Sequence, residues 1–268
     1  MSSKITVEAI RGMKARGGKI AALTAYDFPL AKMLDEAGIP LILVGDSLGM
    51  VVLGYPDTTR VTMAEMEHHV RAAARARPRA LLGADLPYRS YETAAMAVKN
   101  ARRLIAAGAE FVKAEGGRKI LPQVRAIISA GIPYCGHLGM LPQSVVAEGG
   151  YHVKGKTEAE HRALLADAQA LAKAGAFAIV LELVTPPVAA EITARVPIPT
   201  IGIGSGDGCD GQILVTYDLA GLFPWFRPRF VKPGAECAVE IKSAAAAWKK
   251  SVEAAAFVQV AKDVKEKK

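Results

Sequence analysis

The chain has 268 residues and a net charge of +8, with 51% hydrophobic and 22% charged residues. This composition excludes a largely disordered protein, because enough apolar side chains are present to bury a sizeable core. No apolar run reaches the roughly 18 residues that a membrane-spanning helix needs, and the N-terminus has no signal-peptide core, so we expect a soluble cytoplasmic protein.

Short apolar runs alternate with helical segments along the chain. The runs predict strands at 20–25, 41–45, 80–84, 111–115, 133–137, 177–182 and 199–204, with a weaker eighth at 213–218. Helical spacing predicts helices at 30–37, 62–77, 91–107, 121–130, 157–174 and 188–195. Two of these open with a capping box, Thr62-x-x-Glu65 and Thr157-x-x-Glu160.

This alternation predicts a (β/α)8 TIM barrel that forms a single domain over residues 1–268, with an added N-terminal helix. A doubly wound open sheet is the alternative fold. Such a sheet usually has a glycine-rich nucleotide turn after its first strand, and TAYDFPL at 24–30 contains no glycine. The pattern therefore favours the barrel.

The C-terminal segment, from about 235 to 268, is predicted as a helical extension. Residues 227–268 hold ten Lys and Arg against five Asp and Glu. A basic tail of this kind could bind nucleic acid, but no nucleic-acid motif accompanies it, so we interpret it as a solvated helix and expect no nucleic-acid partner. The three cysteines include no CxxC pair, which argues against a disulfide framework or a cysteine-rich zinc site.

Five consecutive predicted strands end in ionisable residues. Taken singly, each could be a helix N-cap or a hydrogen-bonded core residue. In a parallel barrel, however, the carboxyl ends of all strands meet at one face, where the active site lies. We therefore predict that one site gathers Asp46, Asp85, Lys113, Glu115, His137 and Glu182.

The residue types at these strand ends indicate a reaction class. The carboxylates of Asp46, Asp85 and Glu115 are hard oxygen ligands that suit Mg²⁺, and without a cation they would repel one another. Lys113 adds a positive charge for an anionic substrate or a developing enolate. Glu182 lies on an otherwise apolar run, where burial would raise its pKa and make it a usable general base. Together these residues predict proton abstraction beside the carbonyl of a 2-oxo acid.

The strings that carry this chemistry resemble the ketopantoate hydroxymethyltransferase family. The resemblance runs in order from about Thr24 to Asp218, over most of the chain. It rests on TAYD (24–27), LVGDSLGM (43–50), ADLP (84–87), VKAEGG (112–117), CGHLGMLPQS (135–144), GGY (149–151), LELV (181–184), GIGSG (202–206) and DGQILV (210–215).

The resemblance implies transfer of a hydroxymethyl group from 5,10-methylenetetrahydrofolate to 2-oxoisovalerate, giving ketopantoate for pantothenate and coenzyme A synthesis. It implies Asp46, Asp85 and Glu115 as the Mg²⁺ carboxylates. Asp46, Ser47, Asp85 and Lys113 would hold the 2-oxo acid. Glu182 would be the proton acceptor and His137 an active-site histidine, and the immediate base is left open between Glu182, His137 and a water.

The resemblance also implies a cytoplasmic homo-oligomer, typically a decamer. Two long loops, 49–62 and 138–156, are rich in Gly and Pro and could close over the folate or contact other subunits. The stretch 221–236 departs from the family pattern. Two other functions stay open: a different Mg²⁺-dependent barrel enzyme on 2-oxo acids, such as a phosphoenolpyruvate mutase or isocitrate lyase relative, and a non-catalytic protein with a binding tail.

Overall fold

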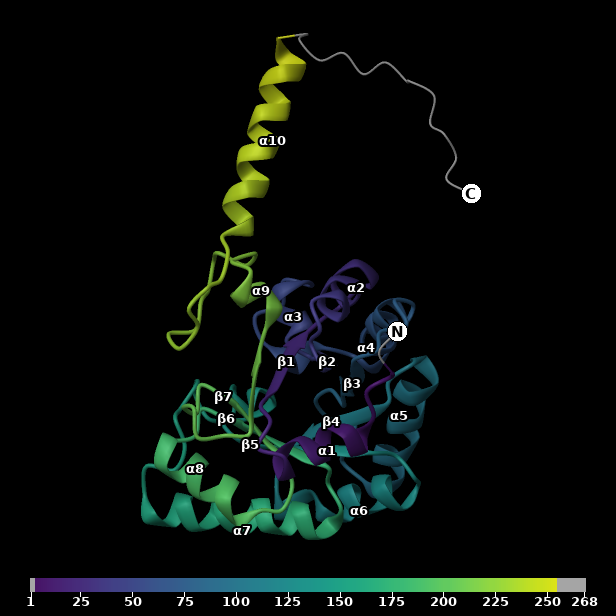
Figure 1. Cartoon of the computed structure of the whole chain (residues 1–268), viewed down its shortest axis with the longest axis vertical. Coiled ribbons are helices and arrows are strands. Elements are labelled where there is room, and N and C mark those ends of the chain that lie inside the picture. The colour runs from purple at the N-terminus through teal and green to yellow at the C-terminus, as the bar shows by residue number, and fades with distance from the viewer. Residues whose placement is uncertain (1–2, 255–268) are drawn as a thin grey trace. The chain divides into compact units, whose positions relative to one another are not determined.

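A computed structural model describes residues 3–254 and shows a closed barrel of eight parallel strands in sequence order, which confirms the predicted fold (Figure 1). Contacts divide the chain into two compact units, residues 1–216 and 217–268, and the barrel strands lie in the first. The strands are β1 (Ile20–Thr24), β2 (Leu41–Val44), β3 (Leu81–Asp85), β4 (Phe111–Glu115), β5 (Tyr134–Gly139), β6 (Ala178–Glu182), β7 (Thr200–Ile203) and β8 (Gly211–Leu214).

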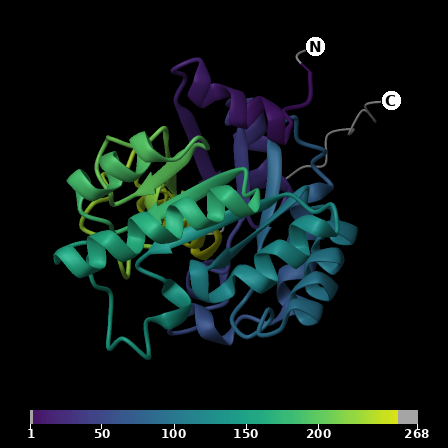
Figure 2. The same ribbon diagram turned by 90° about the horizontal axis from the view of Figure 1, so that it is seen from below.

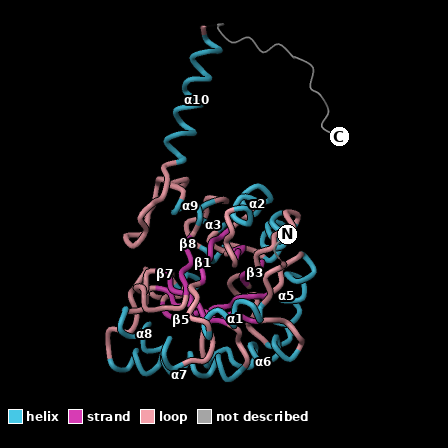
Figure 3. Tube along the Cα trace, in the orientation of Figure 1, coloured by secondary structure: helices cyan, strands magenta, loops and turns pink. Residues whose placement is uncertain are grey.

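Helices surround the strands on the outside of the barrel (Figures 2 and 3). Both predicted capping boxes form, at Thr62 and Thr157, where each threonine side chain accepts from the backbone three residues on. None of the helices within residues 3–254 is long and apolar enough to cross a membrane. The helices of this unit are α1 (Val7–Ala15), α2 (Phe28–Glu36), α3 (Leu48–Val51), α4 (Met63–Ala74), α5 (Ala94–Ala107), α6 (Leu121–Ser129), α7 (Glu158–Ala174) and α8 (Pro186–Arg195), with the short 3₁₀ helices η1 (Thr58–Arg60), η2 (Arg118–Ile120) and η3 (Pro142–Ser144).

The eighth strand differs from its prediction. It spans Gly211–Leu214 rather than 213–218, and Thr216–Leu219 forms the short helix α9. The strand begins earlier because Gly211 lets the chain run against β1, where an added Cβ would lie 2.3 Å from the Ile20 carbonyl oxygen. It ends earlier because the Thr216 hydroxyl donates to the Thr24 carbonyl at 2.6 Å.

The second unit contains α10 (Cys237–Glu253), which confirms that the predicted extension is helical over these residues. Its part beyond residue 254 lies outside the described residues. A hydrogen bond from the Gly234 N–H to the Leu219 carbonyl, at 2.8 Å, closes the loop between α9 and α10.

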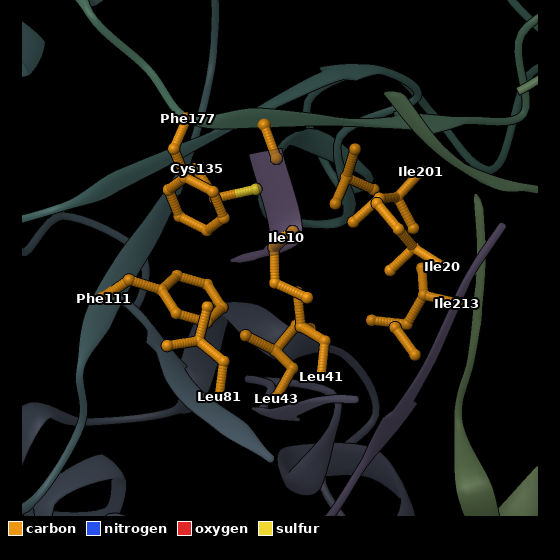
Figure 4. Packing of buried hydrophobic residues seen from close by; sticks show 13 residues of the cluster. Ile10, Ile20, Leu41, Leu43, Leu81, Phe111, Cys135, Phe177, Ile201 and Ile213 are labelled. Carbon is orange, nitrogen blue, oxygen red and sulfur yellow. The ribbon is translucent and has the colours of Figure 1, made fainter. Parts of the chain in front are cut away.

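The amino-terminal end of the barrel is filled by apolar side chains (Figure 4). Ile10 of α1 is fully buried and packs among residues from the strands, including Ile20, Leu41 and Phe111. Lys14, also on α1, forms a 2.7 Å ion pair with Asp210 before β8. The predicted N-terminal helix therefore closes this end, so that a site inside the barrel must open at the other.

The register of the parallel strands places predicted site residues beside one another. Asp85 on β3 is paired with Lys113 on β4, and Glu115 is paired with His137 on β5. Gly139, the last residue of β5, is paired with Glu182 at the end of β6. Paired residues of neighbouring strands point to the same side of a sheet, so these side chains share one region.

Candidate active site

One pocket at the carboxyl ends of the strands contains every predicted site residue. Its volume is about 90 Å³, room for a few waters or part of a small organic acid. Apolar side chains from β2, β6, β7 and β8 form much of the remaining wall, which residues of β1 and of the loops complete. The predicted residues that line it are Asp46, Ser47, Asp85, Lys113, Glu115, His137 and Glu182.

Asp46 does not lie on β2 itself but in the turn that follows it. The strand ends at Val44, and Gly45 brings the backbone close to β3. A Cβ on Gly45 would lie 3.0 Å from the Ser47 Oγ and 3.4 Å from the Asp85 Oδ2. The Asp46 N–H donates to that same Oδ2 at 3.1 Å, so the turn brings the two aspartates together.

The Lys113 ammonium lies at the centre of the charged groups. Its Nζ is 3.2 Å from the Asp85 Oδ1 and donates to the His137 Nδ1 at 3.0 Å. Burial lowers the pKa of Lys113, but the carboxylates of Asp85, Asp46 and Glu115 raise it more, so its net pKa is above the ordinary value. Lys113 is therefore a permanent cation within the pocket.

His137 is neutral in this environment. Burial and the nearby Lys113 ammonium lower the pKa of its imidazole well below the ordinary value. Because Lys113 donates to Nδ1, the ring proton is on Nε2. That Nε2 lies 3.1 Å from the Glu182 Oε2, although it is not aligned for a hydrogen bond. His137 thus faces Glu182 with its protonated nitrogen.

The buried carboxylates bind protons more tightly than they would in water. Burial raises the pKa of Asp46 to about 7, and the charge of Asp85 adds to the effect. Burial and then Asp46 raise the pKa of Glu115 well above its ordinary value. Burial also raises the pKa of Glu182 to about 7. Such values suit groups that exchange protons, or that meet a cation, near neutral pH.

The carboxylates fit a divalent cation by their chemistry. Within residues 3–254, no three His, Cys, Asp or Glu side chains form a ready metal-binding group. Asp46 and Asp85 nevertheless lie in one pocket with like charges, and the Asp85 Oδ1 is 3.2 Å from the Lys113 ammonium but accepts no aligned hydrogen bond. Mg²⁺ commonly takes one or two protein carboxylates and completes its octahedron with substrate oxygens and waters. A pair of aspartates is sufficient for that kind of site.

The structure adds residues that the sequence did not single out. Gln143, on η3, contacts Asp46 and Glu115, and the Tyr91 hydroxyl donates to Gln143. The Tyr26 and Ser47 hydroxyls form a 2.9 Å hydrogen bond. The only sequence signal for Gln143 is its place in the string CGHLGMLPQS, since it lies in an irregular loop without periodicity.

Both long loops reach the pocket. Thr58, from the loop 49–62, is buried and lines it, as does Pro142 from the loop 138–156. Their predicted roles as lids over a folate or as subunit contacts stay predictions.

Solved structures with the same architecture include a mutase and a lyase. Phosphoenolpyruvate phosphomutase from Streptomyces platensis subsp. rosaceus aligns with a TM-score of 0.64 at 15% identity, covering 93% of this chain and 88% of that one. A 2,3-dimethylmalate lyase, a member of the PEP mutase/isocitrate lyase superfamily, aligns with a TM-score of 0.60 at 15% identity, covering 97% and 92%. At these identities the likeness shows the fold alone.

Sequence relatives identify the family. A 3-methyl-2-oxobutanoate hydroxymethyltransferase of Moorella thermoacetica is 56% identical over 88% of this chain and 88% of its own. One from Ignicoccus hospitalis is 51% identical over 95% and 97%. The family model for ketopantoate hydroxymethyltransferase matches residues 4–259. The chain therefore belongs to the ketopantoate hydroxymethyltransferase family of enzymes.

Proposed function

We propose that this enzyme transfers a hydroxymethyl group from 5,10-methylenetetrahydrofolate to 2-oxoisovalerate, giving ketopantoate for pantothenate and coenzyme A synthesis. The observation that carries the proposal is the convergence of Asp46, Asp85, Lys113 and Glu182 in one buried pocket. Family membership supports the overall reaction, since relatives of about 50% identity are named for it.

Asp46 and Asp85 would hold a divalent ion, Mg²⁺, with Glu115 as the third carboxylate beside it. When bound, the ion would polarise the substrate's carbonyl and so acidify its C3 proton. Ser47 and Lys113 would bind the 2-oxo acid, with the Lys113 ammonium placed against its carboxylate or the developing negative charge. Three buried carboxylates beside one ammonium leave an excess of negative charge. The ion would offset it, as would the protons that the carboxyls with raised pKa values retain.

Glu182 is proposed as the base that removes the C3 proton. It is buried and its pKa is raised to about 7, so the ionised form is available at neutral pH and is basic enough to accept a proton. His137 is a weaker candidate, because Nδ1 already accepts from Lys113 and Nε2 carries the ring proton. The carbanion carbon then bonds to the methylene carbon of the folate as the first of its two C–N bonds breaks. Water replaces the second nitrogen to give the hydroxymethyl group, and its proton goes to the departing tetrahydrofolate.

Deuterium exchange at C3 of 2-oxoisovalerate tests this proposal. In D₂O, the purified protein should exchange this position in the presence of Mg²⁺, and should form ketopantoate only when methylenetetrahydrofolate is added. Asp46→Ala should abolish the metal-dependent exchange while the circular dichroism spectrum is unchanged. Absence of exchange by the Mg²⁺-loaded wild-type protein would overturn the proposal.

A further inference from the structure

Gln143 holds two carboxylates that come from different strands. The residue is 5% exposed, and its Nε2 donates to the Asp46 Oδ2 at 2.7 Å and to the Leu86 carbonyl at 3.0 Å. Its backbone N–H donates to the Glu115 Oε2 at 2.9 Å. One residue of the loop 138–156 therefore fixes one oxygen of each carboxylate.

Tyr91 supports the orientation of the Gln143 amide, which the partners of its Nε2 determine. The Tyr91 Oη donates to the Gln143 Oε1 at 2.6 Å. The two neighbours of Nε2 are a carboxylate oxygen and a backbone carbonyl, which can only accept. The opposite amide orientation would place Oε1 against both acceptors, so only the observed orientation satisfies every partner. Tyr91 thus acts on Asp46 through Gln143.

We propose that Gln143 is a positioning residue, supported by Tyr91, that sets the carboxylates of Asp46 and Glu115 for binding of a divalent cation. The inference rests on the proposed function, because it assumes that this pocket binds the ion. The hydrogen bond from Gln143 to the Asp46 Oδ2 restrains rotation of the carboxylate. It thereby sets the direction in which the other oxygen, Oδ1, points. A ligand that is already oriented loses less conformational freedom when the ion binds.

A second consequence concerns the loop itself. Gln143 lies on η3, and the hydrogen bonds from its backbone and side chain to Glu115 and Asp46 form only when this segment occupies its observed place. The affinity for the cation is therefore coupled to the ordering of the loop 138–156. Partners that orient metal ligands in this way typically change metal affinity by about 10- to 100-fold when removed.

Binding of Mn²⁺ alone, followed by the electron paramagnetic resonance signal of the free ion, tests this inference without any activity measurement. Gln143→Leu should raise the Mn²⁺ dissociation constant by up to about 100-fold, and Tyr91→Phe by about 10-fold. Because Tyr91 acts through Gln143, the double variant should match Gln143→Leu within about twofold, as a coupled pair does.

Two matched variants control for general effects. Gln212→Leu removes an exposed amide that donates to the Gly206 carbonyl at 2.9 Å, and Tyr134→Phe removes a buried hydroxyl that donates to the Ala114 carbonyl at 3.1 Å. Both should bind Mn²⁺ as the wild type does, and thermal melts without metal should show each protein folded. If Gln143→Leu does not fold, Gln143→Asn, whose amide is one methylene too short, takes its place.

The outcomes separate the two proposals. Unchanged Mn²⁺ affinity in the Gln143 variant, beside a wild type that binds the ion, would overturn this inference and leave the proposed function standing. If the double variant lost Mn²⁺ affinity by the product of the two single-variant losses, Tyr91 would act independently of Gln143. That result would overturn the role of Tyr91. A wild-type protein that binds neither Mn²⁺ nor Mg²⁺ would overturn the proposed function, and this inference with it.

Discussion

Lys113, at the level of single residues, explains why this pocket can hold so many ionisable groups. Its ammonium contacts Asp85 and His137 directly and lowers the pKa values of Asp46, Glu115 and Glu182, against the opposite effect of burial. One permanent cation thus keeps several buried carboxylates able to ionise near neutral pH. His137 stays neutral because burial lowers its pKa and because a second cation beside Lys113 is unfavourable.

Replacing Glu182 by Gln should remove the proton acceptor and retain the shape of the pocket. Loss of a general base typically lowers a rate by about 10²- to 10⁴-fold. We expect C3 deuterium exchange of 2-oxoisovalerate to fall by this amount, and binding of the 2-oxo acid, measured by calorimetry with Mg²⁺, to be nearly unchanged. Normal exchange by the Glu182→Gln protein would assign the base to His137 or a water.

The pH dependence of exchange should follow the ionisation of Glu182. Burial raises the pKa of this carboxyl to about 7, so below that pH the base is protonated and inactive, and above it the base is free. At saturating Mg²⁺ the rate should therefore rise about tenfold between one pH unit below and one above that value. A rate that stays level from pH 5 to 8 would contradict this assignment.

At the level of elements, the helix starts that carry a capping box were predicted well because their signals are local. The capping boxes at Thr62 and Thr157 formed as expected, and the glycines that close α5 and α7, Gly108 and Gly175, adopt left-handed conformations. The eighth strand was misplaced because Ile213–Val215 is apolar, whereas the pairing that defines the strand begins at Gly211. Non-local pairing of this kind leaves no periodic signal.

The site residues show the same difference between local signals, which the sequence carries, and non-local contacts, which it does not. All seven predicted residues were found in one pocket, because a barrel brings its strand ends to a common face. Gln143 was not predicted, since its contact with Asp46 spans 97 residues and depends on the path of an irregular loop. Tyr91 was likewise outside the prediction, because the helix expected at 91–107 begins only at Ala94 and leaves Tyr91 in a loop.

The capping boxes offer a prediction at this scale. Thr157→Ala should remove the 3.2 Å hydrogen bond that the Glu160 N–H donates to the Thr157 hydroxyl, while the bond from the Thr157 N–H to the Glu160 carboxylate remains. We expect a loss of about 1 kcal/mol in the free energy of unfolding, measured in urea. Mn²⁺ affinity should not change, because α7 starts away from the pocket residues. A Thr157→Ser variant, which keeps the hydroxyl, should restore most of the stability.

For the whole molecule, the site should affect stability. Asp46, Glu115 and Glu182 have raised pKa values in the folded protein, so the folded state keeps protons that the unfolded state has already released between about pH 4 and pH 7. The free energy of unfolding of the metal-free protein should therefore fall as the pH rises through that range. Glu182→Gln should reduce this fall, which urea titrations at pH 5 and 7.5 can measure.

Mg²⁺ should oppose this loss, because the site proposed for it exists only in the folded arrangement. At a concentration of 100 times its dissociation constant, a ligand that binds the folded state raises the free energy of unfolding by about 2.7 kcal/mol. The rise in melting temperature on adding Mg²⁺ should be larger at pH 7.5 than at pH 5, where Asp46 is mostly protonated. Asp46→Ala should lose the rise at both pH values. An equal rise in the wild type and in Asp46→Ala would assign the ion to another place.

The register between β3 and β4 has a consequence for how the barrel assembles. Asp85 and Lys113 are cross-strand partners, as are Glu115 and His137 on the next pair of strands. A slip of one residue would turn one partner of each pair to the opposite face and leave a charge buried without compensation. Closed forms with shifted strands are thereby penalised, in addition to the fit of the Phe111 ring beside Gly83, where an added Cβ would lie 2.0 Å from the ring. The groups proposed to perform the chemistry thus also help the folding chain select the correct closure.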